Sequence, residues 1–358
     1  LSTHTAKLYG KINGNDKDID LQNFRLLYGK KTSVALNAKL KNWQNGESLI
    51  ASFENLALQS NVSDFRYFMP NDYPDYYPQK INLSGNGNYK KGKILANLSA
   101  KLDDISRVKI KGNFDTNQPE SYLADIKLSD LDLAKWLQDS LNFKTANVDI
   151  AINGTGLQPS EMNTKAEISI RNFSYLANPF DTIKMSASLV KSQLDFSTTY
   201  SDSIADFTLS ATGNIDSIQQ KINLNANIKM LDLLALNISD SAVWASTKAN
   251  INVKMDSLHQ SFSAKLTETN FTSPNESIYF TPLDLQAYNS EDSASIKLTW
   301  ENIAFDLNMN HAFDKLAFAD LEASKLQKAK IFEVDTTNRP MRLSFSLKAK
   351  ESQNLMDF

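Results

Sequence analysis

Several residue types that carry chemistry are missing or scarce in this chain of 358 residues. There is no cysteine, which excludes disulfide bonds and thiolate metal sites. The three histidines, His4, His259 and His311, are far apart in the sequence and stand in unrelated contexts, so we expect no zinc site and no other metal centre. No apolar run approaches the roughly 18 residues that a membrane-spanning helix needs.

Charge of one sign is also lacking. The 38 lysine and arginine residues nearly balance the 41 aspartate and glutamate residues, and no long run of like charge occurs. A nucleic-acid binder needs a basic stripe, and a protein held at an anionic membrane surface by charge needs a polybasic segment. The sequence contains neither, so we expect no nucleic-acid partner.

Three segments of the sequence partly match motifs of enzymes or of metal and cofactor sites, but each lacks a required residue or structural context. Asp16, Asp18 and Asp20 begin like a calcium loop, but Leu21 occupies the position where glycine is required. Ser188-x-x-Lys191 has a nucleophile spacing within an alternating strand, where residues three apart face opposite sides. Gly85-x-Gly87 leads into another strand and not into the helix of a dinucleotide site. We therefore expect no catalytic residue, no cofactor and no enzyme.

What the chain does contain is alternation of apolar and polar residues, in runs of about nine that end at Gly, Asn or Asp. The segments 150–154, 209–213 and 222–228 are clear examples. Such alternation is typical of a β-strand with one apolar face. It predicts strands near 33–40, 48–58, 80–89, 93–102, 107–115, 122–129, 146–154, 164–173, 183–191, 193–200, 204–213, 221–230, 245–255, 260–268, 283–289, 293–300, 302–310 and 343–349.

Helical signal is sparse. Residues 129–137 form the best candidate, because Ser129 and Asp132 have capping-box spacing and Leu133, Trp136 and Leu137 share a helix face. Residues 230–236 resemble a second copy of this short helix. Residues 313–331 fit a helix or a strand equally well.

Glycines at the ends of alternating runs mark an irregular internal repeat. Gly85, Gly112, Gly154 and Gly213 follow similar sequences at unequal intervals. A β-helix needs a nearly fixed period, so the pattern favours a meander of antiparallel hairpins with variable loops. We divide the chain into a first part of the sheet (1–64), a linker or loop rich in tyrosine and proline (65–79) and a continuing sheet (80–358).

An antiparallel sheet with one apolar face must cover that face. A second sheet, helices, closure into a barrel or a ligand could do so. The predicted helices are too few for so many strands. Alternation alone leaves a sandwich, a barrel and an open trough in play.

Three segments resemble the TamB-like translocation and assembly module proteins, in the form found in Bacteroidetes. These segments are DLQNFRLLYG (20–29), ISIRNFSYLANPFDTIKMSASL (168–189) and LDFSTTYSDSIADFTLSATGNID (194–216). They are similar to the family's repeated unit, in which a strand is followed by an apolar-Asn-aromatic motif, a second strand, an Asp-rich turn and a third strand. The resemblance covers most of residues 7–330.

The resemblance implies an all-β fold: a long twisted antiparallel sheet curled into a U-shaped trough, or β-taco, with very few short helices. It also implies a periplasmic protein anchored in the inner membrane, with the anchor outside this segment of a longer polypeptide. The implied function is a non-enzymatic conduit for phospholipid between the inner and outer membranes. An outer-membrane barrel of the Omp85 type is the implied partner.

Alternation and resemblance together predict a lipid groove lined by the apolar faces of the strands, along which acyl chains slide without a fixed polar site. Two other functions stay open: a scaffold for assembly of outer-membrane β-barrel proteins, and a β-rich adhesin. The predicted groove residues, which could equally form an ordinary core, are Ile94, Leu98, Val148, Ile150, Ile168, Ile183, Leu189, Phe196, Phe207, Leu209, Leu224, Ile228, Ile251, Val253, Phe262, Leu266, Ile296, Leu298, Phe305 and Leu307.

Overall fold

The computed structural model describes residues 5–65, 77–216, 218–301, 303–312 and 342–349. Of these described residues, 71% lie in strands and 2% in helices. The chain divides into two compact units. Unit 1 comprises residues 1–192 with 198–204 and 235–237, and unit 2 comprises residues 193–197, 205–234 and 238–358. Each unit is described by itself below.

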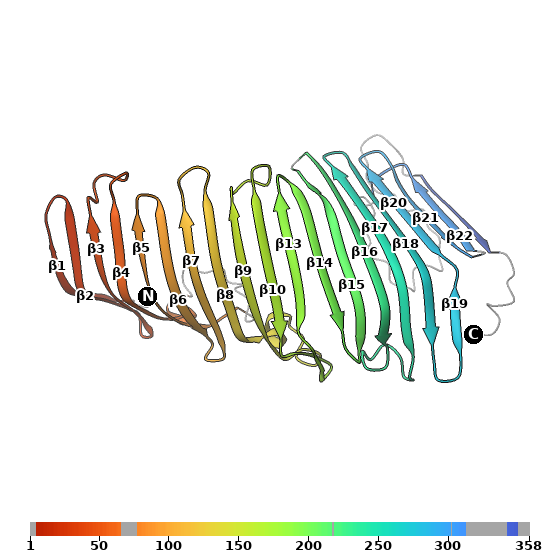
Figure 1. The fold of residues 1–358 in the computed structure, drawn as a ribbon, viewed down its shortest axis with the longest axis horizontal. Coiled ribbons are helices and arrows are strands. Elements are labelled where there is room, and N and C mark those ends of the chain that lie inside the picture. The colour runs from red at the N-terminus through yellow and green to blue at the C-terminus, as the bar shows by residue number, and fades with distance from the viewer. Residues whose placement is uncertain (1–4, 66–76, 217, 302, 313–341, 350–358) are drawn as a thin grey trace. The chain divides into compact units, whose positions relative to one another are not determined.

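Unit 1 is an antiparallel meander in which each strand pairs with the strand before it and the strand after it, as Figure 1 shows from red to light green. Its sheet is built from β1 (Ala6–Gly14), β2 (Asp18–Tyr28), β3 (Thr32–Lys41), β4 (Ile50–Asn61), β5 (Lys80–Lys90), β6 (Lys93–Leu102), β7 (Ser106–Asp115), β8 (Ser121–Asp132), β9 (Thr145–Thr155), β10 (Asn163–Arg171) and β13 (Ile183–Val190). A short hairpin of β11 (Phe173–Tyr175) and β12 (Asn178–Phe180) stands apart from it.

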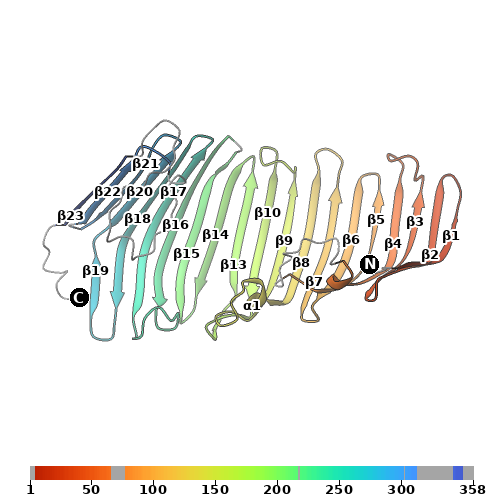
Figure 2. The ribbon, with the colours of Figure 1, turned by 180° about the vertical axis from the view of Figure 1, so that it is seen from behind.

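Unit 2 continues with the same architecture, shown in green to blue in Figures 1 and 2. Its strands are β15 (Ala205–Ile215), β16 (Gln219–Asp232), β17 (Trp244–Asp256), β18 (His259–Thr272), β19 (Ser277–Phe280), β20 (Leu283–Ser290), β21 (Ala294–Trp300), β22 (Ile303–Met309) and β23 (Leu343–Ala349). Both β19 and β20 pair with β18, one with each half of that strand. The residues of β14 (Gln193–Ser201) are shared between the two units.

Tight turns set the register of the hairpins. Between β5 and β6, Lys91 and Gly92 both adopt positive φ, at 49° and 81°. Positive φ at both central residues is the signature of a two-residue turn whose twist matches that of the strands. Lys90 consequently lies opposite Lys93, and the rest of the hairpin pairs without a break. Glycine suits such a position because it has no Cβ to clash.

Bulges interrupt the alternation at defined places. In β2 the register shifts between Leu21 and Phe24, and Asn23 between them has φ of 49°. In β8 it shifts between Leu128 and Leu131, around Asp130 with φ of 53°. Asn and Asp tolerate this left-handed conformation better than most residues. A bulge adds one residue to one strand and bends that strand.

The two bulges share a hydrogen-bonding device. The backbone N–H of Asn23 donates to Oδ1 of Asn37 on β3 at 2.7 Å. The backbone N–H of Asp130 donates to Oδ1 of Asn147 on β9 at 2.8 Å. A bulge leaves its extra residue out of the ladder, and in both places an asparagine on the next strand accepts the hydrogen bond that the ladder does not supply.

The predicted helix at 129–137 is too long, and residues 230–236 contain no helix. Only Leu133–Trp136 is helical (α1), because β8 continues past Ser129 through its bulge and pairs as far as Asp132 with Thr145. The N-cap is therefore Asp132, whose side chain accepts from the N–H of Lys135 at 3.0 Å. Residues 230–232 extend β16 opposite β17, and 233–238 form a turn without a helix. Elsewhere in the described residues, Val62–Asp64 form a 3-10 turn.

The strands predicted from alternation are all present within a few residues of their expected bounds. Those that alternation missed are β1 and β2, where bulges break the period, and the short β11, β12 and β19. The segment 313–331 and most of the predicted linker at 65–79 lie outside the described residues. The predicted fold class is confirmed: the described residues are all-β and form a long antiparallel sheet that is not closed into a barrel, which is consistent with a curled trough.

Candidate functional site: the apolar face of the sheet

In unit 1, side chains from every strand of the meander fall into register as continuous apolar rows. Residues that pair across adjacent antiparallel strands point to the same face. One row runs from β1 to β13 without a polar residue. It consists of Leu8, Leu26, Val34, Leu58, Leu83, Ala100, Val108, Leu128, Val148, Ile170 and Ile183.

Further rows lie on the same face, two residues away along each strand. The next one contains Leu98, Ile110, Ile126, Ile150, Ile168 and Met185. The one beyond it is made of small and apolar residues: Ile12, Leu21, Ala38, Phe53, Gly87, Ala96, Gly112, Ala124, Ile152, Ala166 and Ala187. We call the surface formed by these rows the unit 1 apolar face.

Unit 2 has an equivalent surface, the unit 2 apolar face. One of its rows consists of Ala211, Leu224, Ile251, Ala264, Leu285, Leu298, Phe305 and Leu347. A second consists of Gly213, Ile222, Val253, Phe262, Ala287, Ile296, Leu307 and Phe345. Every strand from β15 to β23, except the short β19, contributes to both rows.

The registers place the predicted groove residues on these two faces. Ile94, Leu98, Val148, Ile150, Ile168, Ile183 and Leu189 belong to the unit 1 apolar face. Phe207, Leu209, Leu224, Ile228, Ile251, Val253, Phe262, Leu266, Ile296, Leu298, Phe305 and Leu307 belong to the unit 2 apolar face. Phe196 lies half-buried in β14.

Sequence reasoning missed further members of the faces. Leu83, Val108 and Leu128 stand in alternating strands that were correctly predicted, so their period was a sufficient signal. Leu8 and Leu26 lie on β1 and β2, where the bulges hide the period. For those two residues the sequence signal was weaker. The motif Leu21-x-Asn23-Phe24 was the available sign of the strand, because it marks a bulge within β2 and not the end of a strand.

The side chains of the apolar faces are only half covered. No large side chain in the described part of the chain is fully buried, and the most buried apolar residues are mostly small, such as Ala146 at 1% and Ala211 at 8% exposure. On β7 the burial alternates, with Val108 and Ile110 half-buried and Lys109 and Lys111 exposed. The apolar face is therefore shielded by its own neighbours and not by a packed core.

No second layer covers these faces in the described structure. Substantial contacts between elements join neighbouring strands of the sheet, and the exceptions are α1 and β11, which contact β9 near one end. Figure 2 shows α1 at the lower edge of the sheet, below β8 and β9. Contiguous exposed apolar surface larger than a few hundred Å² marks an interaction site in soluble proteins. The apolar faces are thus the candidate functional site.

Aromatic rings fill the gaps above two glycines of the unit 1 apolar face. The ring of Phe53 on β4 lies over Gly87, where an added Cβ would be 2.6 Å from the ring. The ring of Tyr122 on β8 lies over Gly154 in the same way, at 2.9 Å. An aromatic ring above a strand glycine restores the packing that the glycine lacks. The two rings thus occupy the space that these glycines leave on the unit 1 apolar face.

The opposite, polar face satisfies its own hydrogen bonds. In unit 2, four asparagines close a ring: Asn223 donates to Asn252, Asn252 to Asn250, Asn250 to Asn225 and Asn225 back to Asn223, at 2.6–2.7 Å. Each side-chain amide donates once and accepts once. Such saturation suits a surface that faces water, and it contrasts with the apolar face behind it.

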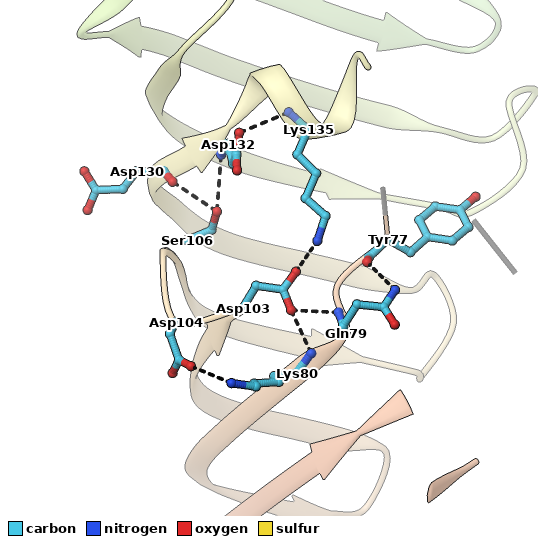
Figure 3. Close-up of polar contacts among 9 residues, drawn as sticks. All are labelled: Tyr77, Gln79, Lys80, Asp103, Asp104, Ser106, Asp130, Asp132 and Lys135. Atoms are coloured by element: carbon cyan, nitrogen blue, oxygen red, sulfur yellow. Dashed lines mark hydrogen bonds and ion pairs between the residues drawn. The ribbon is translucent and has the colours of Figure 1, made fainter. Parts of the chain in front are cut away.

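A polar network joins the ends of strands β5 to β8 (Figure 3). The carboxylate of Asp103 accepts from the backbone N–H of Gln79 at 2.7 Å and of Lys80 at 2.8 Å, and pairs with the ammonium of Lys135 in α1. Burial raises the pKa of Asp103, but the hydrogen bonds from Lys135, Lys80 and Gln79 outweigh it and leave the pKa below its ordinary value. The network fixes α1 at the edge of the sheet.

A chain of aromatic side chains packs beside this edge. Phe143 lies 5.3 Å from Tyr175, Phe173 lies 5.3 Å from Phe180, and Phe180 lies 5.8 Å from Tyr200, between ring centroids. These residues link the segment after α1 and the β11–β12 hairpin to β14 within unit 1. They form a small local core at one end of the strands and leave the rows of the apolar face uncovered.

The described residues contain neither a candidate metal site nor a helix that could span a membrane. No three His, Asp or Glu side chains gather there in a way that could hold a metal ion. No helix there is long and apolar enough to cross a membrane. Comparison of the chain with protein families, curated proteins and solved structures gives no match.

Proposed function

We propose that the apolar faces bind the acyl chains of phospholipid, and that the protein is a non-enzymatic conduit for lipid. The observation that carries this proposal is the apolar row from Leu8 to Ile183, which crosses all the sheet strands of unit 1 without a polar residue. No second layer of the described residues covers this row. Each buried methylene contributes roughly 0.8 kcal/mol, so an acyl chain gains by leaving water for such a surface.

The rows also support movement of lipid along the sheet. A strand of 9 residues, such as β10, spans roughly 30 Å, which is enough for an acyl chain to lie across the sheet. Successive positions along the row from Leu58 to Ile183 offer nearly the same apolar contact. A lipid would therefore move between them with little change in free energy, while its head group stays in water.

The proposal extends to the setting in the cell. The resemblance of residues 20–29 to TamB-like proteins supports a periplasmic conduit between the inner and outer membranes, held by an anchor outside this segment and meeting an Omp85-type barrel. The alternative of a scaffold for assembly of outer-membrane proteins predicts contact through strand edges and not through the apolar face.

Photo-crosslinking of the purified protein with phospholipid tests the proposal. A photoreactive residue at Phe207 or Leu224 lies on the unit 2 apolar face and should give lipid adducts. The matched control at Asn223 points to the polar face, and Asp206 pairs with Lys229 at the bulge of β16. Both controls should give no adduct.

Native mass spectrometry of the same preparation provides a second readout, since it detects phospholipid that co-purifies with the protein. Lipid adducts at none of the four positions, together with a lipid-free mass, would contradict the conduit. Protein adducts at edge positions in the same experiment would instead favour the scaffold.

A further inference from the structure

The polar face of unit 1 contains a hollow of about 590 Å³ that the lipid proposal does not use. Three cationic side chains, Arg25, Lys101 and Arg107, lie around it. Between them stand neutral hydrogen-bonding side chains, among them Gln59 and Asn82. We call this feature the basic hollow. Its polar side chains lie on the face opposite to the acyl-chain rows, and Leu58, Leu83 and Ala100 of the first row also border it. An inference from these polar groups stands apart from the proposed function.

The register of the sheet creates the basic hollow. On the polar face, Arg25 on β2 is followed across the strands by Ala35, Ala57, Ser84 and Ser99, and then by Lys109 on β7. Small side chains on four successive strands leave a depression, and a long cationic side chain stands at each end of it. In the adjacent row, Gln59, Asn82, Lys101 and Arg107 form one wall.

The lining of the basic hollow is chemically one-sided. Its polar side chains are cations, amides and hydroxyls, all of which can donate hydrogen bonds. Among the described residues, no carboxylate lines it. Lys101 and Arg107 have acidic neighbours outside the lining, Asp104 at 3.6 Å and Asp130 at 3.9 Å. Both pairs are exposed, and exposed pairs of this kind neutralise little charge. Arg25 has no ion pair within the described residues.

Like charges also oppose one another directly on these strands. Lys101 lies opposite Arg107 across β6 and β7, and Lys109 lies opposite Lys127 across β7 and β8. Directly opposed like charges destabilise a sheet. Neither Lys109 nor Lys127 forms an ion pair in the described part of the chain, and Asp149 on β9 lies opposite Lys127 on its other side. A bound anion would relieve this repulsion, and it would be attracted to the hollow by the same charges.

We propose that the basic hollow binds a phosphate ester that carries a hydroxylated group. The planar guanidinium groups of Arg25 and Arg107 suit bidentate recognition of phosphate. The surrounding amides and hydroxyls suit the hydroxyls of a sugar or of glycerol. A volume of about 590 Å³ has room for a group of this size. The phosphate ester could belong to a soluble sugar phosphate or to a lipid head group.

Calorimetric titration with glucose 1-phosphate tests the soluble source, and co-sedimentation with phosphatidylglycerol vesicles tests the lipid source. The test variant is Arg25→Gln with Arg107→Gln. The control variant, Lys111→Gln with Lys165→Gln, removes the same charge from the same face outside the lining. Circular dichroism checks that both fold. Glucose and phosphatidylcholine vesicles, which lack net negative charge, serve as ligand controls.

We expect the test variant to bind at least tenfold more weakly to whichever phosphate source the wild type binds, and the control variant to change less than twofold. Loss of glucose 1-phosphate binding alone identifies a soluble ligand, and loss of vesicle binding alone identifies a lipid head group. No binding by the wild type to either source would overturn the proposal. Equal weakening in the two variants would also overturn it, since that result indicates diffuse charge and not a site.

Discussion

The hydroxyl groups of Tyr122 and Thr164 are hydrogen-bonded to each other across Gly154. Tyr122 belongs to β8, Thr164 to β10, and Gly154 to the intervening strand β9, in the same cross-strand row. The bridge is possible because Gly154 has no side chain. It places two satisfied polar groups on an otherwise apolar face, and it leaves the ring of Tyr122 flat against the sheet.

Substitution of Gly154 by alanine should therefore destabilise unit 1. The new Cβ would lie 2.5 Å from Oγ1 of Thr164 and 2.9 Å from the Tyr122 ring, so both must move. We expect a loss of about 1–3 kcal/mol in the free energy of unfolding, as for overpacking elsewhere, measured by urea denaturation. Gly112→Ala is the control, because its Cβ meets nothing closer than 3.4 Å. A loss in the control as large as in Gly154→Ala would refute the argument.

The bulge at Asn23 predicts a backbone effect. Valine is β-branched and disfavours the φ of 49° that this position requires. Asn23→Val should cost about 1–2 kcal/mol, whereas Asn23→Gly should be close to neutral because glycine adopts positive φ readily. Thermal or urea unfolding measures both. Asn97→Val, at an exposed position in the regular strand β6, should not destabilise the protein. If Asn23→Val unfolds like wild type, the bulge does not constrain this residue.

The Asp103 network predicts a dependence of stability on pH. Its folded-state pKa lies below the ordinary value of 3.8, so its contribution is present above that value and disappears as the pH falls through the folded-state pKa. Asp103→Asn should cost about 1–3 kcal/mol at pH 7. The difference from wild type should shrink at acidic pH, below about 4.

Urea titrations at pH 7 and at pH 3 measure this change in the difference. Asp104→Asn is the matched control on the same turn, since its exposed pairs with Lys80 and Lys101 should contribute less than about 1 kcal/mol. A difference between Asp103→Asn and wild type that stays constant with pH would show that the charge of Asp103 is unimportant.

The proposed acyl-chain surface predicts opposite results for two neighbouring residues. Ile150 points to the unit 1 apolar face and Ala151 to the polar face. Ile150→Glu places a carboxylate on the unit 1 apolar face and should weaken phospholipid binding at least tenfold. A tenfold loss corresponds to about 1.4 kcal/mol of binding free energy. Ala151→Glu should leave binding unchanged. Fluorescent-lipid titration measures both. Equal binding by the two variants would argue that lipid does not use this face.

Much of the candidate site was predictable because alternation survives wherever strands are regular. On β7, Val108 and Ile110 alternate with Lys109 and Lys111, and their neighbours on β6 and β8 repeat the pattern. The site was less predictable where a bulge shifts the period. The step from Leu21 to Phe24 obscured β2, and the step from Leu128 to Leu131 made residues 129–132 resemble a helix start.

By itself the sequence determined the all-β class, the position of most strands, and which of two consecutive residues in a strand is apolar. These features depend on the local period of apolar residues and on turn chemistry. Only the tertiary structure decided which apolar residues lie side by side, from Leu8 to Ile183, because register is set by pairing between strands. It also decided that these rows have no covering layer in the described residues, and that Arg25, Lys101 and Arg107 surround one hollow. Whether an apolar face is covered, and which cationic side chains lie together, both depend on contacts between segments that are distant in the sequence. The local period of apolar residues does not encode such contacts.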